Sequence, residues 1–346
     1  MEILITGGAG FIGSHVAEFY ARKGYDVTVL DNLSREKTAL YNWNHLKKNY
    51  NIKLVRGDVI DRKKVEELTK NKDFIVHAAA QVAVTHSIQN PREDFESNVM
   101  GTFNVLEGAR KSNKDPTIIY CSTNKVYGEN VNSVEVEERG KRYIFRSKKY
   151  RDGIPEDFPI DLCEHTPYGC SKLAGDIYMQ DYASIYGLRT GIFRMSCIYG
   201  TRQFGTEDQG WVAHFIISTL EERPITIYGD GKQVRDVLFI TDLIEAYDKF
   251  KKNSKHLKGE VFNIGGGREN TISLIELLNL LEKKTGKRSK IKFADWRPSD
   301  QKVYISDIRK AKEKLNWKPK ISLEKGIEKF IEWYKIKDDQ NCNFGR

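Results

Sequence analysis

Two residues four positions apart, Tyr168 and Lys172, could work as an acid–base pair. If the segment is helical, this spacing places the phenol and the ammonium on one face. The positive charge would favour the phenolate, so a phenol whose ordinary pKa is about 10 could act as a base at neutral pH. Thr123 supplies a hydroxyl that could hydrogen-bond the same reacting hydroxyl or carbonyl. The pair alone is weak evidence, because any surface helix can carry a tyrosine and a lysine four apart.

A glycine-rich run, Thr-Gly-Gly-Ala-Gly-Phe-Ile-Gly at residues 6–13, follows an apolar segment and precedes a helical pattern. There the glycines allow a tight turn and let the backbone approach a pyrophosphate, which would lie on the free N–H groups of the helix. Asp31 ends the next apolar segment, where a carboxylate can accept hydrogen bonds from both ribose hydroxyls. Because this carboxylate repels a 2′-phosphate, the sequence predicts NAD rather than NADP.

More cofactor contacts are expected where further strands end, since parallel sheets bind ligands at the carboxyl ends of their strands. Arg35 lies close to Asp31 and weakens the preference for NAD slightly. The candidate cofactor-binding residues are Gly7, Gly10, Phe11, Ile12, Gly13, Asp31, Asn32, Ser34, Arg35, Asp58, Val59, Ala78, Ala79, Ala80, Gln81, Asn98, Tyr168 and Lys172.

Short runs rich in valine and isoleucine alternate with helical patterns in the first half of the chain, which is the rhythm of βαβ units. The pattern predicts an α/β protein with a Rossmann doubly wound parallel sheet. Strands are expected at residues 3–5, 26–30, 53–55, 74–76, 117–120 and 190–193, and helices at 13–23, 61–71, 94–112 and 168–186.

The second half predicts a smaller α/β substrate-binding domain made of separate pieces. Residues 1–194 plus 235–264 would form the NAD-binding domain and residues 195–234 plus 265–346 the smaller one, with the ligand cleft between them. Residues 129–167 carry many charges and no regular period, which is typical of a long insertion, here a candidate lid near Tyr168. The expected helices are 211–222, 243–251, 273–285, 306–315 and 323–335, and the expected strands 225–228, 237–239 and 261–264.

The composition fits a globular protein, with 346 residues, 39% of them hydrophobic, and a formal charge of +9. A net positive field favours anionic ligands such as nucleotide diphosphates. It would also suit nucleic acid, but no nucleic-acid-binding motif is present. The five cysteines show no Cys-x-x-Cys and no metal-ligand spacing, so we expect buried thiols and no metal site. No apolar run of membrane-spanning length and no signal-peptide pattern occurs, and we expect a cytoplasmic protein.

Residues 1–335 resemble the extended short-chain dehydrogenase/reductases of the NAD-dependent epimerase/dehydratase family. The glycine run and the Tyr168/Lys172 pair carry the superfamily resemblance. A narrower resemblance, to the subgroup that inverts C2 of CDP-hexoses of the paratose and tyvelose type, rests on residues 122–128, 202–212, 229–236 and 297–301. Before Tyr199 that subgroup tends to have His-Ser-Ser-Met, whereas this chain has Met-Ser-Cys-Ile at 195–198.

The resemblance implies a nucleotide-sugar substrate, with a CDP-sugar favoured. It assigns Arg235 and Arg297 to the diphosphate, Asp300 to the region of the ribose and Gln209 to a nucleotide-binding loop. It also implies a homodimer or higher homo-oligomer, through helices near residues 94–112 and 168–186. The candidate catalytic residues are Thr123, Tyr168 and Lys172, and the candidate substrate-binding residues are Thr123, Asn124, Arg202, Gln203, Gln209, Val212, Arg235, Arg297 and Asp300.

Asn124 and Lys125 argue against a dehydratase, because nucleotide-sugar 4,6-dehydratases need two carboxylic acids after the threonine and this chain has neither. Epimerisation by transient oxidation needs no further acid, because one hydride is removed and then returned. The expected reaction is therefore inversion of C2 through a 2-keto sugar. A UDP-sugar 4-epimerase of the UDP-galactose or UDP-glucuronate type is the alternative enzyme. A dinucleotide-binding sensor without chemistry is the alternative from another class, and the intact Tyr168/Lys172 pair disfavours it.

Overall fold

Seven parallel strands form the main sheet of the computed structural model, which describes residues 1–297 and 299–343. Their order is β12-β8-β5-β4-β1-β2-β3, in which the chain starts in the middle and winds outward in both directions. The expected doubly wound parallel sheet is therefore confirmed, and β12 extends it by one edge strand. The strands are β1 (Glu2–Thr6), β2 (Asp26–Asp31), β3 (Lys53–Arg56), β4 (Phe74–His77), β5 (Thr117–Thr123), β8 (Arg189–Met195) and β12 (Glu260–Ile264).

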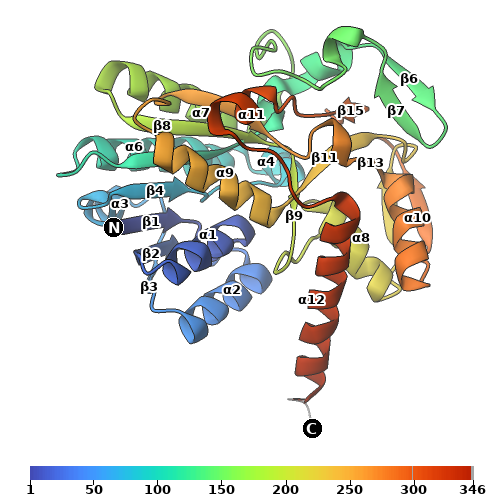
Figure 1. Cartoon of the computed structure of the whole chain (residues 1–346), viewed down its shortest axis with the longest axis horizontal. Helices are drawn as coiled ribbons and strands as arrows, with labels where there is room; N and C mark the ends of the chain where they lie inside the picture. The colour runs from blue at the N-terminus through green and yellow to red at the C-terminus, as the bar shows by residue number, and fades with distance from the viewer. Residues whose placement is uncertain (298, 344–346) are drawn as a thin grey trace.

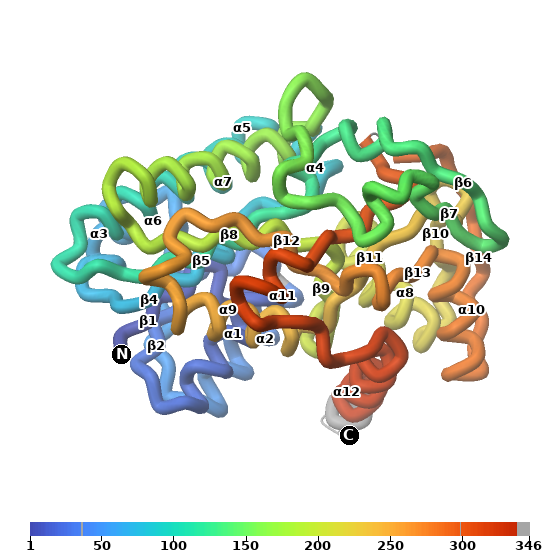
Figure 2. The backbone as a smooth tube through the Cα atoms, turned by 45° about the horizontal axis from the view of Figure 1, so that its top comes forward, coloured from blue at the N-terminus to red at the C-terminus, as the bar shows by residue number. Residues whose placement is uncertain are grey.

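Helices cover both faces of this sheet (Figures 1 and 2). Because both faces are buried, the central strands β1, β4 and β5 are apolar along most of their length. One face carries α1 (Phe11–Arg22), α2 (Glu36–Asn49) and α9 (Ile240–Asn253), and the other carries α3 (Arg62–Thr69), α6 (Gly101–Arg110) and α7 (Thr166–Tyr186). Helix α2 was not anticipated from the sequence.

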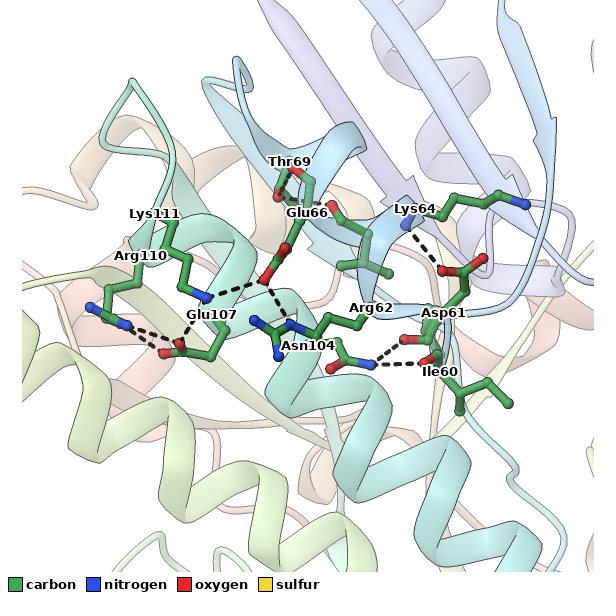
Figure 3. A network of polar contacts seen from close by, with 12 residues as sticks. Ile60, Asp61, Arg62, Lys64, Glu66, Thr69, Asn104, Glu107, Arg110 and Lys111 are labelled. Carbon is green, nitrogen blue, oxygen red and sulfur yellow. Dashed lines mark hydrogen bonds and ion pairs between the residues drawn. The ribbon is translucent and has the colours of Figure 1, made fainter.

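Helices α3 and α6 are joined by polar contacts at their exposed edge (Figure 3). Lys111 Nζ pairs with Glu66 of α3 at 3.1 Å and with Glu107 of α6 at 3.5 Å. Asn104 donates from Nδ2 to the carbonyl oxygen of Val59 at 2.9 Å. These contacts hold α6 against the loop that leads into α3, whose first turn is capped by the Asp61 carboxylate.

The helix expected at 94–112 is interrupted. Helix α5 (Pro91–Phe95) runs into a π-helical turn (Glu96–Met100), which continues as α6. A π-helical turn contains one extra residue, and such turns occur often at functional sites. Here the turn carries Asn98, one of the candidate cofactor residues. A short helix, α4 (Val84–Gln89), precedes this region.

A smaller second sheet has the order β13-β11-β15, and β9 also pairs with β11. Two further strands, β10 and β14, pair in parallel beside it. Helices α8, α10 and α12 pack around these strands, whereas α11 returns to α9 and β12 (Figures 1 and 2). The elements are β9 (Cys197–Tyr199), α8 (Trp211–Leu220), β10 (Ile225–Tyr228), β11 (Val234–Phe239), β13 (Thr271–Ser273), α10 (Leu274–Thr285), β14 (Ile291–Ala294), β15 (Val303–Tyr304), α11 (Arg309–Leu315) and α12 (Leu323–Asn343).

Three of the passages of the chain between the two sheets meet at the buried residue Asp236. The chain passes outward after β8, back from β11 into α9, and outward again after β12. Ser196 on the first crossing donates to Asp236 Oδ1 at 2.5 Å, and its N–H donates to the carbonyl oxygen of Ile264 at 3.0 Å. The N–H of Gly267 on the third crossing donates to Asp236 Oδ2 at 3.1 Å.

Residues 129–167 contain more regular structure than expected, because β6 (Val136–Arg139) and β7 (Arg142–Phe145) form a hairpin. The hairpin lies against the smaller sheet. Arg142 pairs bidentately with Glu276 of α10 at 2.6 and 2.8 Å, and the Tyr143 hydroxyl donates to Asp230 at 2.5 Å. These contacts fix the hairpin to the smaller sheet, whereas the sequence suggested an irregular lid. Within the described residues, no helix is both long and apolar enough to cross a membrane.

Candidate functional site

The site begins at the turn between β1 and α1, where the glycines have distinct steric roles. Gly7 adopts a φ of 66°, and its N–H donates to the carbonyl oxygen of Leu30 on β2 at 2.8 Å. A Cβ on Gly13 would lie 2.2 Å from the carbonyl oxygen of Gly7, so only glycine lets the helix pack this closely. Gly10 begins α1 with no side-chain cap, which leaves the first N–H groups of the helix available to an anion. This cradle fits a dinucleotide pyrophosphate.

Asp31 ends β2 beside this turn and is buried. Its Oδ2 accepts the N–H of Ala9 at 2.9 Å, and its Oδ1 accepts the N–H of Leu33 at 2.8 Å. Burial raises the pKa of Asp31, and these backbone hydrogen bonds oppose the shift. The carboxylate therefore orients the glycine turn and keeps further lone pairs for hydroxyl donors.

The other candidate cofactor residues lie along the same edge of the sheet. Asn32 Nδ2 donates to Asp58 at 2.7 Å, which joins the loops after β2 and β3. The backbone of Ala78 and Ala79 lies very close to Gly7. A Cβ added to Gly7 would lie only 2.6 Å from the backbone nitrogen of Ala79. The remaining members of this set, on the loops after β2, β3 and β4 or at the start of α1, are Phe11, Ile12, Ser34, Arg35, Val59 and Ala80.

Asn98 fixes the loop after β4 to helix α7. Its Oδ1 accepts the N–H of Gln81 at 2.9 Å, and its Nδ2 donates to the Gln81 carbonyl oxygen at 2.9 Å. The same amide lies 3.1 Å from Asp94 Oδ1 and 3.0 Å from Ser171 Oγ. Asn98 and Gln81 therefore position the site, and the partners Asp94 and Ser171 were not anticipated from the sequence.

Tyr168 and Lys172 are both buried on the inner face of α7, with 8% and 2% of their surfaces exposed. Burial raises the pKa of Tyr168 to about 12, although the Thr123 hydroxyl and the Arg35 charge act in the opposite direction. Burial also lowers the pKa of Lys172 to about 8, and its Nζ lies 4.1 Å from the centre of the Tyr120 ring. Both shifts oppose the charged forms, so a phenolate at Tyr168 would need stabilisation by a nearby positive charge.

A buried network of hydrogen bonds and one ring-stacking contact lies beside Tyr168 and Lys172, and the sequence analysis did not identify it. His77 at the end of β4 lies between the hydroxyls of Thr6, at 2.7 Å, and Thr102, at 3.0 Å. Burial lowers the pKa of His77 to about 3, so the ring is neutral. It stacks on Tyr120, whose hydroxyl donates to the carbonyl oxygen of Lys172 at 3.2 Å. The feature of the sequence that could have indicated this network is His77 itself, a histidine at the end of an apolar strand.

Three distant segments converge next to Thr123. Arg235 on β11 pairs with Asp300 at 2.5 Å. Asn124, directly after β5, donates from Nδ2 to Gln301 Oε1 at 3.3 Å, and Lys125 Nζ donates to the carbonyl oxygen of Ser299 at 3.3 Å. The structure thus brings the predicted substrate residues Thr123, Asn124, Arg235 and Asp300 together.

Arg297 lies further out, beside the loop that carries Gln209. Its Nη2 donates to the carbonyl oxygen of Glu207 at 3.0 Å, and its guanidinium stacks 4.0 Å from the centre of the Tyr228 ring. Gln209 closes this loop through two backbone hydrogen bonds with Thr206. Arg297 and the loop of residues 206–209 therefore lie next to each other.

Arg202, Gln203 and Val212 are placed differently from expectation. Arg202 pairs with Glu18 of α1 at 2.6 Å, and Val212 is buried in the hydrophobic core. Gln203 is buried and donates from Nε2 to the carbonyl oxygen of Ile198 at 3.3 Å. A Cβ on Gly210 would lie 2.9 Å from Gln203 Nε2, so Gln203 lies beside the loop that carries Gln209. Arg202 joins the loop after β9 to helix α1.

A glycine turn at β1, an acid at the end of β2 and a Thr-Tyr-Lys set at β5 and α7 define a short-chain dehydrogenase/reductase. The family model described as GDP-mannose 4,6 dehydratase matches residues 4–330. The chain belongs to this family of NAD-dependent nucleotide-sugar epimerases and dehydratases.

Similar proteins include epimerases of different nucleotide sugars. CDP-paratose 2-epimerase of Salmonella typhi is 44% identical over 340 residues, which cover 96% of this chain and 99% of that protein. UDP-glucuronate 4-epimerase of Thermodesulfobacterium geofontis is 32% identical over 342 residues, covering 96% and 95%. The crystal structure of UDP-glucuronic acid 4-epimerase from Bacillus cereus, in complex with UDP-glucuronic acid and NAD, matches with a TM-score of 0.82 and 29% identity, covering 97% and 100%.

The chain is therefore an NAD-dependent nucleotide-sugar epimerase. The uncapped start of α1, the close glycine packing and Asp31 are the features that fit NAD. When bound, NAD supplies a reversible hydride acceptor next to the Thr-Tyr-Lys set.

Proposed function

We propose that this enzyme inverts C2 of a CDP-hexose of the paratose and tyvelose type, through a transient 2-keto sugar. The observation that carries the proposal is the 44% identity to CDP-paratose 2-epimerase over nearly the full length of both chains. The absence of carboxylates at residues 124 and 125 supports it, because elimination chemistry would need an acid there.

The residues of the chain have distinct tasks in this reaction. Tyr168, as phenolate, accepts the proton of the C2 hydroxyl while the hydrogen on C2 leaves as hydride. Thr123 hydrogen-bonds the same oxygen, and Lys172 stabilises the negative phenolate. After the 2-keto sugar turns its other face, Tyr168 returns the proton to the oxygen as C2 regains a hydride. The reaction is redox-neutral, so the enzyme needs no added oxidant.

The diphosphate end is assigned to Arg235 and Arg297, since guanidinium matches phosphate oxygens with two donors. Asp300, which holds Arg235 in place, would lie near the nucleoside ribose, and Gln209 would line the nucleotide wall. These assignments are proposals that rest on the convergence of the segments and on the family resemblance.

A UDP-sugar 4-epimerase is the second candidate, because relatives and structural neighbours include enzymes named for UDP-sugars. An NMR assay of CDP-, UDP- and GDP-hexoses without added NAD separates the candidates. We expect a new 2-epimer from a CDP-hexose, with deuterium at C2 retained through turnover. Conversion of UDP-galactose or UDP-glucuronate alone would refute the C2 proposal, and full activity in Tyr168→Phe would refute the assigned base.

We also propose that the enzyme is a homodimer. Large apolar side chains are exposed along α7, namely Ile177, Tyr178, Ile185 and Tyr186, and others are exposed nearby at Phe95 and Met100. Apolar residues gathered in this way on a helix surface mark a protein–protein interface.

A further inference from the structure

Lys125 spans the space between the catalytic residues and the proposed diphosphate site. Its N–H donates to Thr123 Oγ1 at 3.3 Å, and a Cβ on Gly169, the neighbour of Tyr168, would lie 3.0 Å from its carbonyl oxygen. At the other end, Nζ donates to the carbonyl oxygen of Ser299 at 3.3 Å. The backbone of Lys125 thus belongs to the reacting end of the cleft and its ammonium to the other end.

Lys125 is also the cation of this cluster that makes no close ion pair, although the charges of Asp300 and Glu129 favour its ammonium. Arg235 is neutralised by Asp300 at 2.5 Å, and Arg297 lies 3.5 Å from Asp208. Among the residues that the structure describes, no carboxylate lies within 4.0 Å of the Lys125 ammonium. Arg235, Asp300 and Lys125 together carry a net positive charge, which Glu129 nearby opposes.

The ammonium of Lys125 retains hydrogen-bonding capacity for a ligand. An ammonium has three donors, and the contact with Ser299 occupies one of them. Burial lowers the pKa of the partly exposed Lys125, which reflects the cost of moving part of this charge away from water, while Asp300 and Glu129 act in the opposite direction. An anionic ligand would offset that cost, whereas a surface lysine would need no such compensation.

We propose that Lys125 binds the sugar-proximal phosphate of the substrate, an inference that rests on the proposed function. The phosphate is attached to C1, and C2 is the adjacent ring carbon. When the C2 hydroxyl reaches Thr123 and Tyr168, the phosphate must therefore lie close to them. In a 4-epimerase the reacting carbon lies across the ring from C1, and the phosphate would lie further away. A cation two residues after Thr123 matches reaction at C2.

This contact would also serve as a pivot. The 2-keto sugar has to turn over between the two hydride transfers, and it can do so by rotation about the bonds that join C1 to the phosphate. Holding the phosphate keeps the substrate in the cleft while the sugar is free of the catalytic residues.

The test compares ligands that differ by this one phosphate. We would titrate CDP and CMP into the NAD-containing enzyme by calorimetry, for the wild type, Lys125→Met and the control Lys148→Met, whose lysine is exposed. Losing one charge-assisted contact should weaken CDP binding in Lys125→Met by about tenfold to one-hundredfold. CMP binding should change by less than about twofold, since CMP lacks the second phosphate. Lys148→Met should match the wild type.

Two further variants protect the test against misfolding. Lys125→Gln should behave as Lys125→Met, and Lys125→Arg should keep most of the preference for CDP over CMP. An unchanged CDP-to-CMP affinity ratio in the Met or Gln variant would overturn the proposal, as would an equal loss of both ligands. If the wild type prefers uracil nucleotides, UDP and UMP replace CDP and CMP. The base and the reaction can thus fail while the role of Lys125 is still tested.

Discussion

At the scale of single residues, Lys172 connects stability with catalysis. Its side chain is fully buried against Tyr120, and burial lowers its pKa from 10.5 to about 8. Below pH 8 the lysine is charged in both the folded and the unfolded chain, so the folded protein bears the full cost of burying the charge. Between pH 8 and 10.5 the folded protein releases its proton first, and this cost disappears.

Lys172→Met should therefore stabilise the cofactor-free protein at pH 7, by on the order of 2 to 3 kcal/mol, while turnover falls by roughly 10² to 10⁴. The gain in stability should shrink as the pH rises from 8 to 10.5. Urea denaturation across this range measures it, with Lys148→Met as the exposed control. A variant less stable than the wild type at pH 7 would contradict the argument.

The candidate catalytic and cofactor residues could be proposed from the sequence because their signals are local. The glycine run, Asp31 and the Tyr168/Lys172 pair each lie within or just after one element, and the agreement between these local patterns carried the hypothesis. The supporting residues His77 and Thr102 could not be found in this way. They meet only because neighbouring strands and the π-helical turn bring them together.

At the scale of elements, Ser273 fixes both the start of α10 and the β6–β7 hairpin. It forms a capping box with Glu276, which also binds Arg142 of the hairpin. Its hydroxyl additionally donates to the carbonyl oxygen of Lys141 at 2.7 Å. A single side chain therefore satisfies backbone groups of two elements.

Ser273→Ala should lower the free energy of unfolding by about 2 kcal/mol, because the cap and the contact to Lys141 are lost together. Asp61→Ala at α3 is the matched control, since Asp61 makes one capping hydrogen bond, and its cost should be about 1 kcal/mol. Chemical denaturation of both variants measures the difference. Equal losses would show that the hairpin contact contributes nothing.

Helix α2 and the β6–β7 hairpin are among the elements that were not predicted from the sequence. In both, polar residues occupy positions that are buried or in contact with another element. Helix α2 buries Asn42 beside Trp43 and Leu46, which obscures its apolar stripe. The β6–β7 hairpin has partly buried strands without a clear alternation and is joined to α10 by the ion pair between Arg142 and Glu276. The βαβ elements, by contrast, were predicted well because both faces of their strands are buried.

At the scale of the whole molecule, the exposed apolar residues on α7 lead to a prediction about assembly. Ile177 and Ile185 lie two turns apart and are 49% and 65% exposed. Replacing both with aspartate would place charges inside the proposed interface, so the double variant should be a monomer where the wild type is a dimer. Light scattering after gel filtration measures the mass. Lys48→Asp on α2 is the control, and a monomeric wild type would refute the proposal.

The order of strands in the main sheet could be expected from the βαβ rhythm, but the route of the chain between the two sheets could not. Strand β11 joins the smaller sheet, and α9 directly after it packs on the larger one. The pairing partners of β11 lie on β9, β13 and β15, which are distant in sequence. Short strands that pair with distant parts of the chain cannot be recognised from the local pattern of apolar and polar residues. The division into two domains at residues 194, 234 and 264 stays a prediction.

The meeting of the three crossings at Asp236 has a consequence for substrate range. The Asp236 carboxylate accepts one hydrogen bond from the segment after β8 and one from the segment after β12, and so joins both segments to β11. With these connections maintained during turnover, the proposed space for the keto sugar would keep nearly the same size. Which hexoses are accepted would accordingly depend on the volume that the rotating ring sweeps out, and a substituent harmless in either resting orientation could still block the reaction midway.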